Sequence, residues 1–188
     1  NNLQVISSIM YLQSRKSTDP NLREAFLESQ NRIKSMVMIH EKLYRSENLA
    51  EFNYSDYIKD LTNSLFRSYR LDTSLINLEL DIGNIILDTD TAVHCGLIIN
   101  ELVSNSIKHA FPVGNSGTIH IYFHIDKNDV YLLEISDNGK GIGDNFAIES
   151  KDTLGMQLVR TLVEQLQGDL HIINDNGTKF KISFSLKK

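Results

Sequence analysis

The sequence predicts an α+β protein in which a helical hairpin precedes an α/β layer. Apolar side chains in the first 45 residues recur at helical spacing, whereas alternation typical of strands first occurs after residue 74. With 188 residues and 41% hydrophobic content, the chain can bury one core and add a smaller element. We therefore expect a helical unit over residues 1–48 and an α/β domain over residues 49–188.

Two helices are expected at the start, separated by a break at residues 17–20 that ends in proline. Helical spacing over residues 1–16 is carried by Leu3, Ile6, Met10 and Gln13. The second helix, which ends near residue 45, carries a seam of Phe26, Ser29, Ile33, Met36, His40 and Leu43. Two antiparallel helices leave such a seam exposed. We therefore predict a homodimer through residues 1–45, in which two hairpins form a four-helix bundle.

His40 and Glu41 in this second helix allow two interpretations. A histidine followed by an acid on a bundle helix is one form that phosphoaccepting histidines take, whereas the alternative is a seam histidine inside the dimer core. The seam interpretation is favoured, because a short motif without its context is a weak signal.

The α/β portion begins after a polar connector at residues 46–53. The expected elements are helices over 54–70, 91–110 and 153–168, and strands over 75–82, 85–87, 118–126, 130–136, 168–174 and 179–186. The strand pairs 118–126 with 130–136 and 168–174 with 179–186 each read as a hairpin. The polar segment 144–152 is a candidate mobile cover for a site.

A polar stripe lies on the long helix predicted over residues 91–110. Glu101, Asn105, Lys108 and His109 gather on one side of that helix, between apolar neighbours. An amide oxygen at Asn105 is a suitable ligand for Mg²⁺, and a carboxylate one turn earlier, at Glu101, can orient or deprotonate a nucleophile. The alternative is an ordinary solvated polar face, which the helix taken alone would favour.

A second group of polar and glycine residues follows the strand that ends near residue 136. Asp137 leads into a loop with Gly139 and Gly141, where the lack of Cβ atoms allows the backbone to approach a ligand. The carboxylate can accept a hydrogen bond from an exocyclic amine such as that of adenine. Thr153 is a natural N-cap, and the free N–H groups beyond it suit a phosphate.

Composition excludes several classes of function. The net charge of −5 and the sequence pI near 5.7 argue against a general nucleic-acid binder. Cys95 is the only cysteine, so a disulfide framework and a cysteine zinc cluster are both excluded, which is compatible with a reducing compartment. No apolar run is long enough to span a bilayer, and the chain, which begins without methionine, is expected to be a fragment of a larger protein.

Four separated blocks resemble the ATPase domain of sensor histidine kinases, a GHKL or Bergerat-type fold shared with DNA gyrase B, Hsp90 and MutL. Residues 100–110 (NELVSNSIKHA) resemble the N box, and residues 137–141 (DNGKG) resemble the first glycine box. Thr153, Leu154, Gly155 and Met156 resemble the second glycine box, while residues 176–178 with Phe180 resemble a reduced terminal box that contributes Thr178.

This resemblance implies an ATP site with Mg²⁺ as cofactor. It assigns Asn105 to Mg²⁺, Asp137 to the adenine amine, and Gly139, Gly141 and Gly155 to backbone contacts with nucleotide or lid. Glu101 would act as base or polariser, and Lys108 and His109 would lie near the phosphates. The fold implied is an α/β sandwich.

The front of the chain is similar to dimerisation helices whose phosphoacceptor motif reads His-x-x-Lys before Asn-Asn-Leu-Gln. Residues 1–4 are Asn-Asn-Leu-Gln, so the resemblance implies a phosphoacceptor histidine just upstream and not at His40. The implied function is autophosphorylation followed by transfer to a response regulator, in the cytoplasmic part of a larger sensor, which can be membrane-bound.

Two other functions remain open from the sequence: a non-catalytic nucleotide-gated dimeric scaffold, and a serine kinase or ATPase of the same fold. A Rossmann dehydrogenase and a P-loop enzyme are disfavoured, because neither glycine motif is present.

Overall fold

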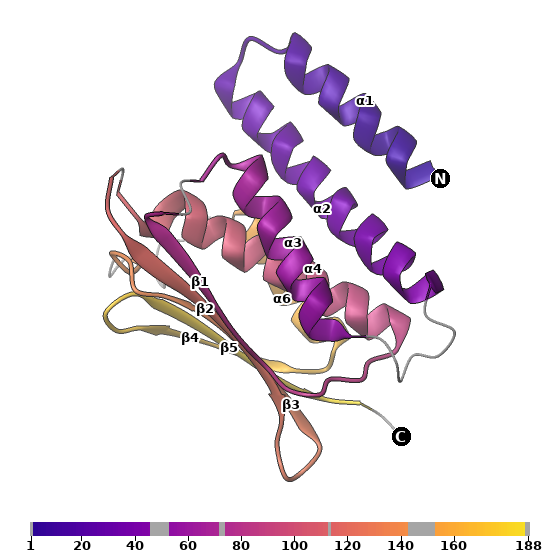
Figure 1. Cartoon of the computed structure of the whole chain (residues 1–188), viewed down its shortest axis with the longest axis vertical. Coiled ribbons are helices and arrows are strands. Elements are labelled where there is room, and N and C mark those ends of the chain that lie inside the picture. Colours follow the sequence, from indigo (N-terminus) through magenta and orange to yellow (C-terminus); the bar gives the residue numbers. More distant parts are fainter. Residues whose placement is uncertain (1, 46–52, 72–73, 113, 143–152, 187–188) are drawn as a thin grey trace.

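The chain folds into a mixed sheet, a layer of helices on that sheet and an outer helical hairpin, as Figure 1 shows. The computed structural model describes residues 2–45, 53–71, 74–112, 114–142 and 153–186. The helices are α1 (Asn2–Lys16), α2 (Pro20–Arg45), α3 (Tyr54–Ser68), α4 (Thr89–Asn105), a π-helical turn (Ser106–Ala110) and α6 (Leu154–Gln165). The strands are β1 (Ile76–Ile82), β2 (Gly117–Ile125), β3 (Val130–Asp137), β4 (Asp169–Asn174) and β5 (Thr178–Ser185).

The five strands form one sheet in the order β1-β2-β3-β5-β4. The two predicted hairpins, β2 with β3 and β4 with β5, are present and antiparallel. The sheet also contains a parallel pairing of β1 with β2 and an antiparallel pairing of β3 with β5. Alternate residues of β2, β3 and β5 are buried against the helices, and at the end of β3 this alternation makes Asp137 point inward.

Helices α3, α4 and α6 cover one face of the sheet (Figure 1). The centre of this layer is α4, in which Ile98, Ile99 and Leu102 are completely buried. Gly96 of α4 allows α3 to approach closely, since a Cβ atom there would lie 2.1 Å from the hydroxyl oxygen of Tyr57. The long helix predicted over 91–110 is therefore correct in place, but its last five residues form a π-helical turn.

The hairpin of α1 and α2 lies outside the helix layer, with α2 facing α3 and α4 and α1 outermost (Figure 1). Asn31, Ser35 and Ile39 of α2 are buried, whereas no residue of α1 is. The inner face of α1 consists of the half-buried Leu3, Ser7, Met10 and Ser14. Of the four residues that carry the predicted helical spacing, Leu3 and Met10 lie on this face, whereas Ile6 and Gln13 are exposed.

The strand predicted at residues 85–87 is wrong. This segment is irregular, although Ile85 and Leu87 are 3% and 4% exposed. Their apolar side chains reach the core without a neighbouring strand, so burial alone produced the strand-like pattern. The predicted boundary between residues 48 and 49, the predicted connector at 46–53 except Asn53, and the cover segment at 144–152 lie outside the described residues. Among those that are described, no helix has the length and apolarity needed to cross a bilayer.

Candidate functional site

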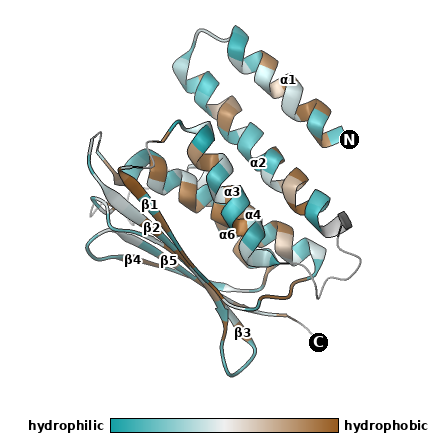
Figure 2. Cartoon of the chain, in the orientation of Figure 1, coloured by the Kyte–Doolittle hydropathy of each residue, from teal (hydrophilic) through white to brown (hydrophobic). Residues whose placement is uncertain are grey.

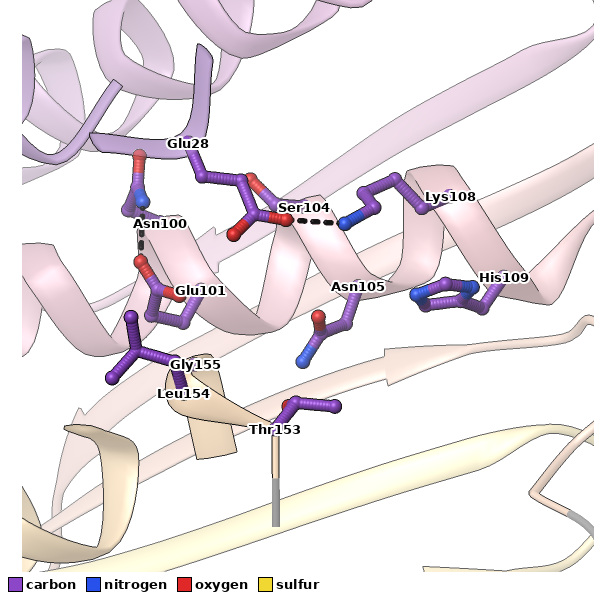
Figure 3. Close-up of a pocket in the computed structure, with 10 residues that line it drawn as sticks. All are labelled: Glu28, Asn100, Glu101, Ser104, Asn105, Lys108, His109, Thr153, Leu154 and Gly155. Carbon is purple, nitrogen blue, oxygen red and sulfur yellow. Dashed lines mark hydrogen bonds and ion pairs between the residues drawn. The ribbon is translucent and has the colours of Figure 1, made fainter. Parts of the chain in front are cut away.

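Two neighbouring cavities lie between the C-terminal end of α4 and the elements that face it. The larger, about 100 Å³, is shown in Figure 3, and the smaller is about 50 Å³. Asn105 and His109 line both cavities, one helical turn apart. Figure 3 shows these two side chains on the side of the helix that faces Thr153. The two cavities can therefore serve as two ends of one elongated site.

The smaller cavity is built around the carboxylate of Asp137. Its Oδ2 atom accepts a hydrogen bond from the Ser106 hydroxyl at 2.8 Å, and its Oδ1 atom accepts from the backbone N–H groups of Gly139 and Thr178 at 3.1 and 3.3 Å. The residue is 9% exposed. A carboxylate that is this well held keeps a fixed direction, which suits recognition of a single amine donor.

The glycines beside Asp137 are required by close backbone contacts. A Cβ atom on Gly139 would lie 2.3 Å from the carbonyl oxygen of Ala110, at the end of the π-helical turn. Gly141 has a φ of 73° and lines the smaller cavity. Gly177 has a φ of 124°, and a Cβ atom there would lie 1.9 Å from the carbonyl oxygen of Asp137. The loops after β3 and before β5 therefore leave no room for a side chain at these three positions.

The N-terminus of α6 forms the wall of the larger cavity. Thr153 caps the helix, because its hydroxyl accepts a hydrogen bond from the Met156 N–H at 3.3 Å. Leu154 and Gly155 also line the cavity, and a Cβ atom on Gly155 would lie 2.7 Å from the Oε2 atom of Glu101. Met156 is buried and its sulfur accepts a hydrogen bond from the Asn105 amide at 3.7 Å. This contact ties α6 to α4 at the site.

The charged residues of the larger cavity are paired with residues of α2. Arg32 forms two hydrogen bonds of 2.7 Å with the two carboxylate oxygens of Glu101. Lys108 pairs with Glu24 at 2.7 Å and also with Glu28. The hydrogen bond to Lys108 lowers the pKa of Glu24, and the hydrogen bond to Glu101 raises the pKa of Arg32. A role of Glu101 as a base therefore requires release from Arg32.

His109 is electrostatically different from its neighbours. Burial lowers the pKa of its imidazole, and the nearby positive charges of Lys108 and Lys140 act in the same direction, against Glu24 and Glu28. The ring is therefore held towards its neutral form, in which one nitrogen donates and the other accepts.

The structure brings all the residues singled out by the sequence to this one region. Glu101, Asn105, Lys108, His109, Thr153, Leu154 and Gly155 line the larger cavity, and Asn105, His109, Asp137, Gly141 and Thr178 line the smaller one. Gly139 and Met156 lie behind the lining residues, in the contacts described above.

Several residues at the site were not assigned a role from the sequence, among them Ser106, Arg32 and Glu28. Ser106 was not predicted because it follows Asn105 directly, and adjacent residues point to different sides of a regular helix. The π-helical turn changes that geometry and places the Ser106 hydroxyl against Asp137. Arg32 and Glu28 are far from the site in sequence. The spacing of Glu24, Glu28 and Arg32 at intervals of four did mark one charged face of α2.

Comparison with protein families gives two matches on this chain. A family described as "Histidine kinase" matches residues 1–69, and a family described as "Histidine kinase-, DNA gyrase B-, and HSP90-like ATPase" matches residues 90–188. The second match includes every predicted site residue, and the first includes Glu24, Glu28 and Arg32.

Curated relatives and solved structures agree with these matches. The sensor histidine kinase PdtaS of Mycobacterium tuberculosis is 33% identical over 174 residues, which is 90% of this chain and 34% of that protein. Blue-light-activated histidine kinase 2 of Erythrobacter litoralis is 25% identical over 60% of this chain and 33% of its own length. The chain thus spans about a third of these relatives.

In structure, the chain is similar to the histidine kinase domain of the blue-light activated kinase EL346 of Erythrobacter litoralis. The TM-score is 0.75 at 19% identity, with 99% of this chain and 88% of the other covered. The Acinetobacter baumannii histidine kinase AdeS gives a TM-score of 0.58 at 18% identity over 99% of this chain and 96% of its own. These two likenesses support the fold.

Proposed function

This chain belongs to the histidine kinases and carries their catalytic core with its ATPase domain, and from that premise we propose that it binds Mg-ATP for phosphorylation of a histidine. The observation that carries the proposal is the meeting of Asn105 and Asp137 at one elongated site, although 32 positions separate them in sequence (105 to 137). An ATPase domain of this family implies nucleotide binding.

The smaller cavity is the proposed adenine end. Asp137 is fixed by three hydrogen bonds and would accept one more from the exocyclic amine, while Phe180 and Ala110 supply apolar surface for the ring. Gly141 and Thr178 complete the lining. A buried carboxylate directed at an amine discriminates adenine from guanine, whose corresponding position carries a carbonyl oxygen.

The larger cavity is the proposed phosphate end. Asn105, between the two cavities, would provide an amide oxygen to Mg²⁺, which when bound neutralises phosphate charge. The capped N-terminus of α6 presents N–H groups with a favourable dipole, and Lys108 adds a positive charge. His109, lining both cavities, would donate a hydrogen bond to a phosphate oxygen.

In the proposed reaction a histidine nitrogen attacks the γ-phosphorus and the bond to the β-γ bridging oxygen breaks, so that ADP leaves. Glu101, freed from Arg32, would accept the imidazole proton or orient the ring. Positioning and charge neutralisation are expected to supply most of the rate enhancement. The phosphoryl group would then pass to an aspartate of a response regulator receiver domain.

The rest of the parent protein's function is proposed on the same basis. Residues 1–48 would form the dimerisation hairpin and residues 49–188 the ATPase domain, with the acceptor histidine just upstream of Asn1. We propose a homodimer through residues 1–45 in the cytoplasmic part of a larger sensor. Family membership of residues 1–69 supports the dimer.

Substitution of the two key side chains tests nucleotide binding. Asn105→Ala and Asp137→Ala should each lower Mg-ATP affinity by more than about a hundredfold, because each leaves a ligand group without its partner in a partly buried site. Isothermal titration calorimetry measures the affinity, and circular dichroism checks folding. Asn77→Ala on β1 and Glu134→Ala on the opposite face of β3 are matched controls that should bind as the unaltered chain does. An unchanged Mg-ATP affinity in both site variants would refute the proposal.

The scaffold and serine-kinase alternatives are separated by phosphate chemistry. A longer chain that includes the residues upstream of Asn1 is incubated with γ-labelled Mg-ATP. The proposed function predicts protein-bound phosphate that is labile in acid and stable in base. Phosphate that is stable in acid would favour the serine kinase, and binding without incorporation would favour the scaffold.

A further inference from the structure

Helix α2 makes a charged contact with the very residues that the proposed reaction uses. Both carboxylate oxygens of Glu101 are taken by the Arg32 guanidinium, at 2.7 Å each, and one of them also accepts from the Asn100 amide at 2.9 Å. The side chains of Arg32 and Glu101 are 12% and 6% exposed. The bidentate geometry makes this pair directional, and because both groups are shielded from water, either one without the other would be a poorly solvated charge.

Lys108, the proposed phosphate ligand, is held in the same way. It pairs with Glu24 at 2.7 Å and with Glu28, and the Glu28 carboxylate also lines the larger cavity, as Figure 3 shows. Two carboxylates beside this lysine present the kind of charge that phosphate oxygens would present. They would also repel the phosphates of an incoming nucleotide.

The remainder of the contact between α2 and the helix layer is partly polar. Asn31 is 3% exposed and accepts a hydrogen bond from the Ser68 hydroxyl of α3 at 2.9 Å, and Ser35, 1% exposed, lies 3.2 Å from the hydroxyl oxygen of Tyr57. Polar interfaces of this kind separate more readily than apolar ones, because the freed groups are solvated by water.

From these contacts we propose that Glu24, Glu28 and Arg32, here called the α2 charge face, form an autoinhibitory latch that holds Glu101 and Lys108 until the hairpin moves. Docking of the hairpin and productive binding of Mg-ATP then compete for the same two side chains. This inference deepens the proposed function and rests on it.

The part of α2 that contacts the larger cavity lies far along the hairpin from the proposed acceptor histidine, as expected for an inactive state. Gln4, in the first turn of α1, lies beside Met38 and Glu41 of α2, in a groove that these residues share. Glu28 precedes Met38 by ten positions (28 to 38), which is about 15 Å along a helix. The proposed acceptor histidine precedes the first turn of α1, so the phosphate end must move along the hairpin to reach it.

The Arg32→Met variant tests the latch through the sign of its effect. Arg32 is a positive charge near the proposed phosphate end, so simple electrostatics predicts weaker nucleotide binding when it is removed. The latch predicts tighter binding, by about tenfold, because a larger fraction of molecules has the site free. Calorimetry with Mg-ATP measures the effect on the chain described here. Lys42→Met is the matched control, because Lys42 also joins α2 to the helix layer, by a 2.7 Å pair with Asp60 of α3, and does not line either cavity.

A reversible lock provides a second test. Asn31→Cys with Ser68→Cys places two thiols where the present side chains form a hydrogen bond between α2 and α3, and the only other cysteine, Cys95, is buried. The oxidised protein should bind Mg-ATP at least about tenfold more weakly than the reduced protein, because the hairpin cannot leave. Mass spectrometry confirms that the disulfide has formed.

The outcomes distinguish a failure of the proposed latch from a failure of the proposed function. Tighter binding by Arg32→Met together with weaker binding by the oxidised lock would support the latch. Weaker or unchanged binding by Arg32→Met, or a lock without effect, would overturn the latch while leaving the proposed function in place if the unaltered chain binds Mg-ATP. If neither the unaltered chain nor the variants bind Mg-ATP, the proposed function itself fails.

Discussion

At the scale of single residues, the site depends on polar side chains that are fixed before any ligand arrives. Asp137 receives three hydrogen bonds, from Ser106, Gly139 and Thr178, and so has a defined orientation. Asn105 is oriented by Met156. Fixed groups of this kind bind a ligand with little loss of side-chain entropy, which favours affinity and specificity.

The protonation of His109 gives a prediction at this scale. Burial and the charge of Lys108 lower its pKa below the ordinary value near 6.5, so the unfolded chain binds more protons than the folded chain between the two values. The free energy of unfolding should therefore decrease as pH falls through that range. Bound phosphates would stabilise the imidazolium, so Mg-ATP should raise the His109 pKa.

Titration of the histidine ring signals by NMR, with and without Mg-ATP, measures both effects. His109→Gln assigns the signal, because it removes one resonance and leaves the others. A His109 pKa at or above the ordinary value in the free protein would contradict the first expectation. A pKa that does not change on saturation with nucleotide would contradict the second.

At the scale of elements, the site depends on the contact between the end of α4 and the end of β3. The π-helical turn places Ser106 against Asp137, and its last carbonyl, from Ala110, accepts a hydrogen bond from the Lys140 N–H at 2.9 Å. π-helical turns inside helices are frequently found at functional sites. Here the turn joins the two cavities, since Asn105 precedes it and His109 belongs to it.

Gly139→Ala should weaken this contact. The added methyl group would lie 2.3 Å from the Ala110 carbonyl oxygen, which forces the β3 loop away from the turn. We expect a loss of about 1–3 kcal/mol in the free energy of unfolding, as for overpacking elsewhere, together with weaker nucleotide binding. Urea denaturation and calorimetry measure the two quantities.

Gly114→Ala is the matched control for that experiment. Its φ of 87° disfavours alanine, yet no atom lies within 4 Å of the added methyl group. The backbone strain alone should lower the free energy of unfolding by about 1 kcal/mol and leave the nucleotide affinity unchanged. If Gly139→Ala keeps the full nucleotide affinity, the packing of the loop against the turn does not control the site.

At the scale of the whole molecule, the hairpin has one face packed against the helix layer and another that is exposed. Asn31, Ser35 and Ile39 of α2 are buried against the helix layer, while α1 lies outermost and exposes Val5, Ile9 and Leu12 at 59%, 52% and 58% (Figures 1 and 2). These three residues lie within one stripe of a helix. An exposed apolar stripe on an outer helix is expected to pack against another helix, and a second copy of the hairpin supplies one.

Ile9→Glu combined with Leu12→Glu should therefore give a monomer, whereas the unaltered chain is expected to be a dimer. Two charges in this apolar stripe would be buried without partners in the dimer, which opposes association strongly. Sedimentation equilibrium measures the mass, and Ile173→Glu, on the edge strand β4 at 39% exposure, is a control for added charge. A monomeric unaltered chain, or a dimer that persists in the double variant, would contradict a dimer built on this stripe.

Much of the fold and of the site followed from local patterns in the sequence. The two β-hairpins were predictable because alternation and turn residues are local signals, and the α4 stripe was predictable because helical spacing places Glu101, Asn105 and His109 on one side. In the structure the alternation of β3 continues one residue beyond the predicted strand, so that Ile135 and Asp137 are both buried. The four motif blocks that resemble histidine kinases connected these local features to one family, which the family matches confirmed.

The sequence by itself thus determined most of the elements, the family and a set of candidate site residues that the fold brings together. Only the tertiary structure decided that β1 pairs in parallel with β2, that residues 85–87 form no strand, and that α2 docks on the site through Arg32 and Glu28. The physical reason is one of range. Helical and strand periodicity arise from neighbouring residues, whereas the partner of a charge such as Glu101, 69 positions from Arg32, is set by how whole elements pack.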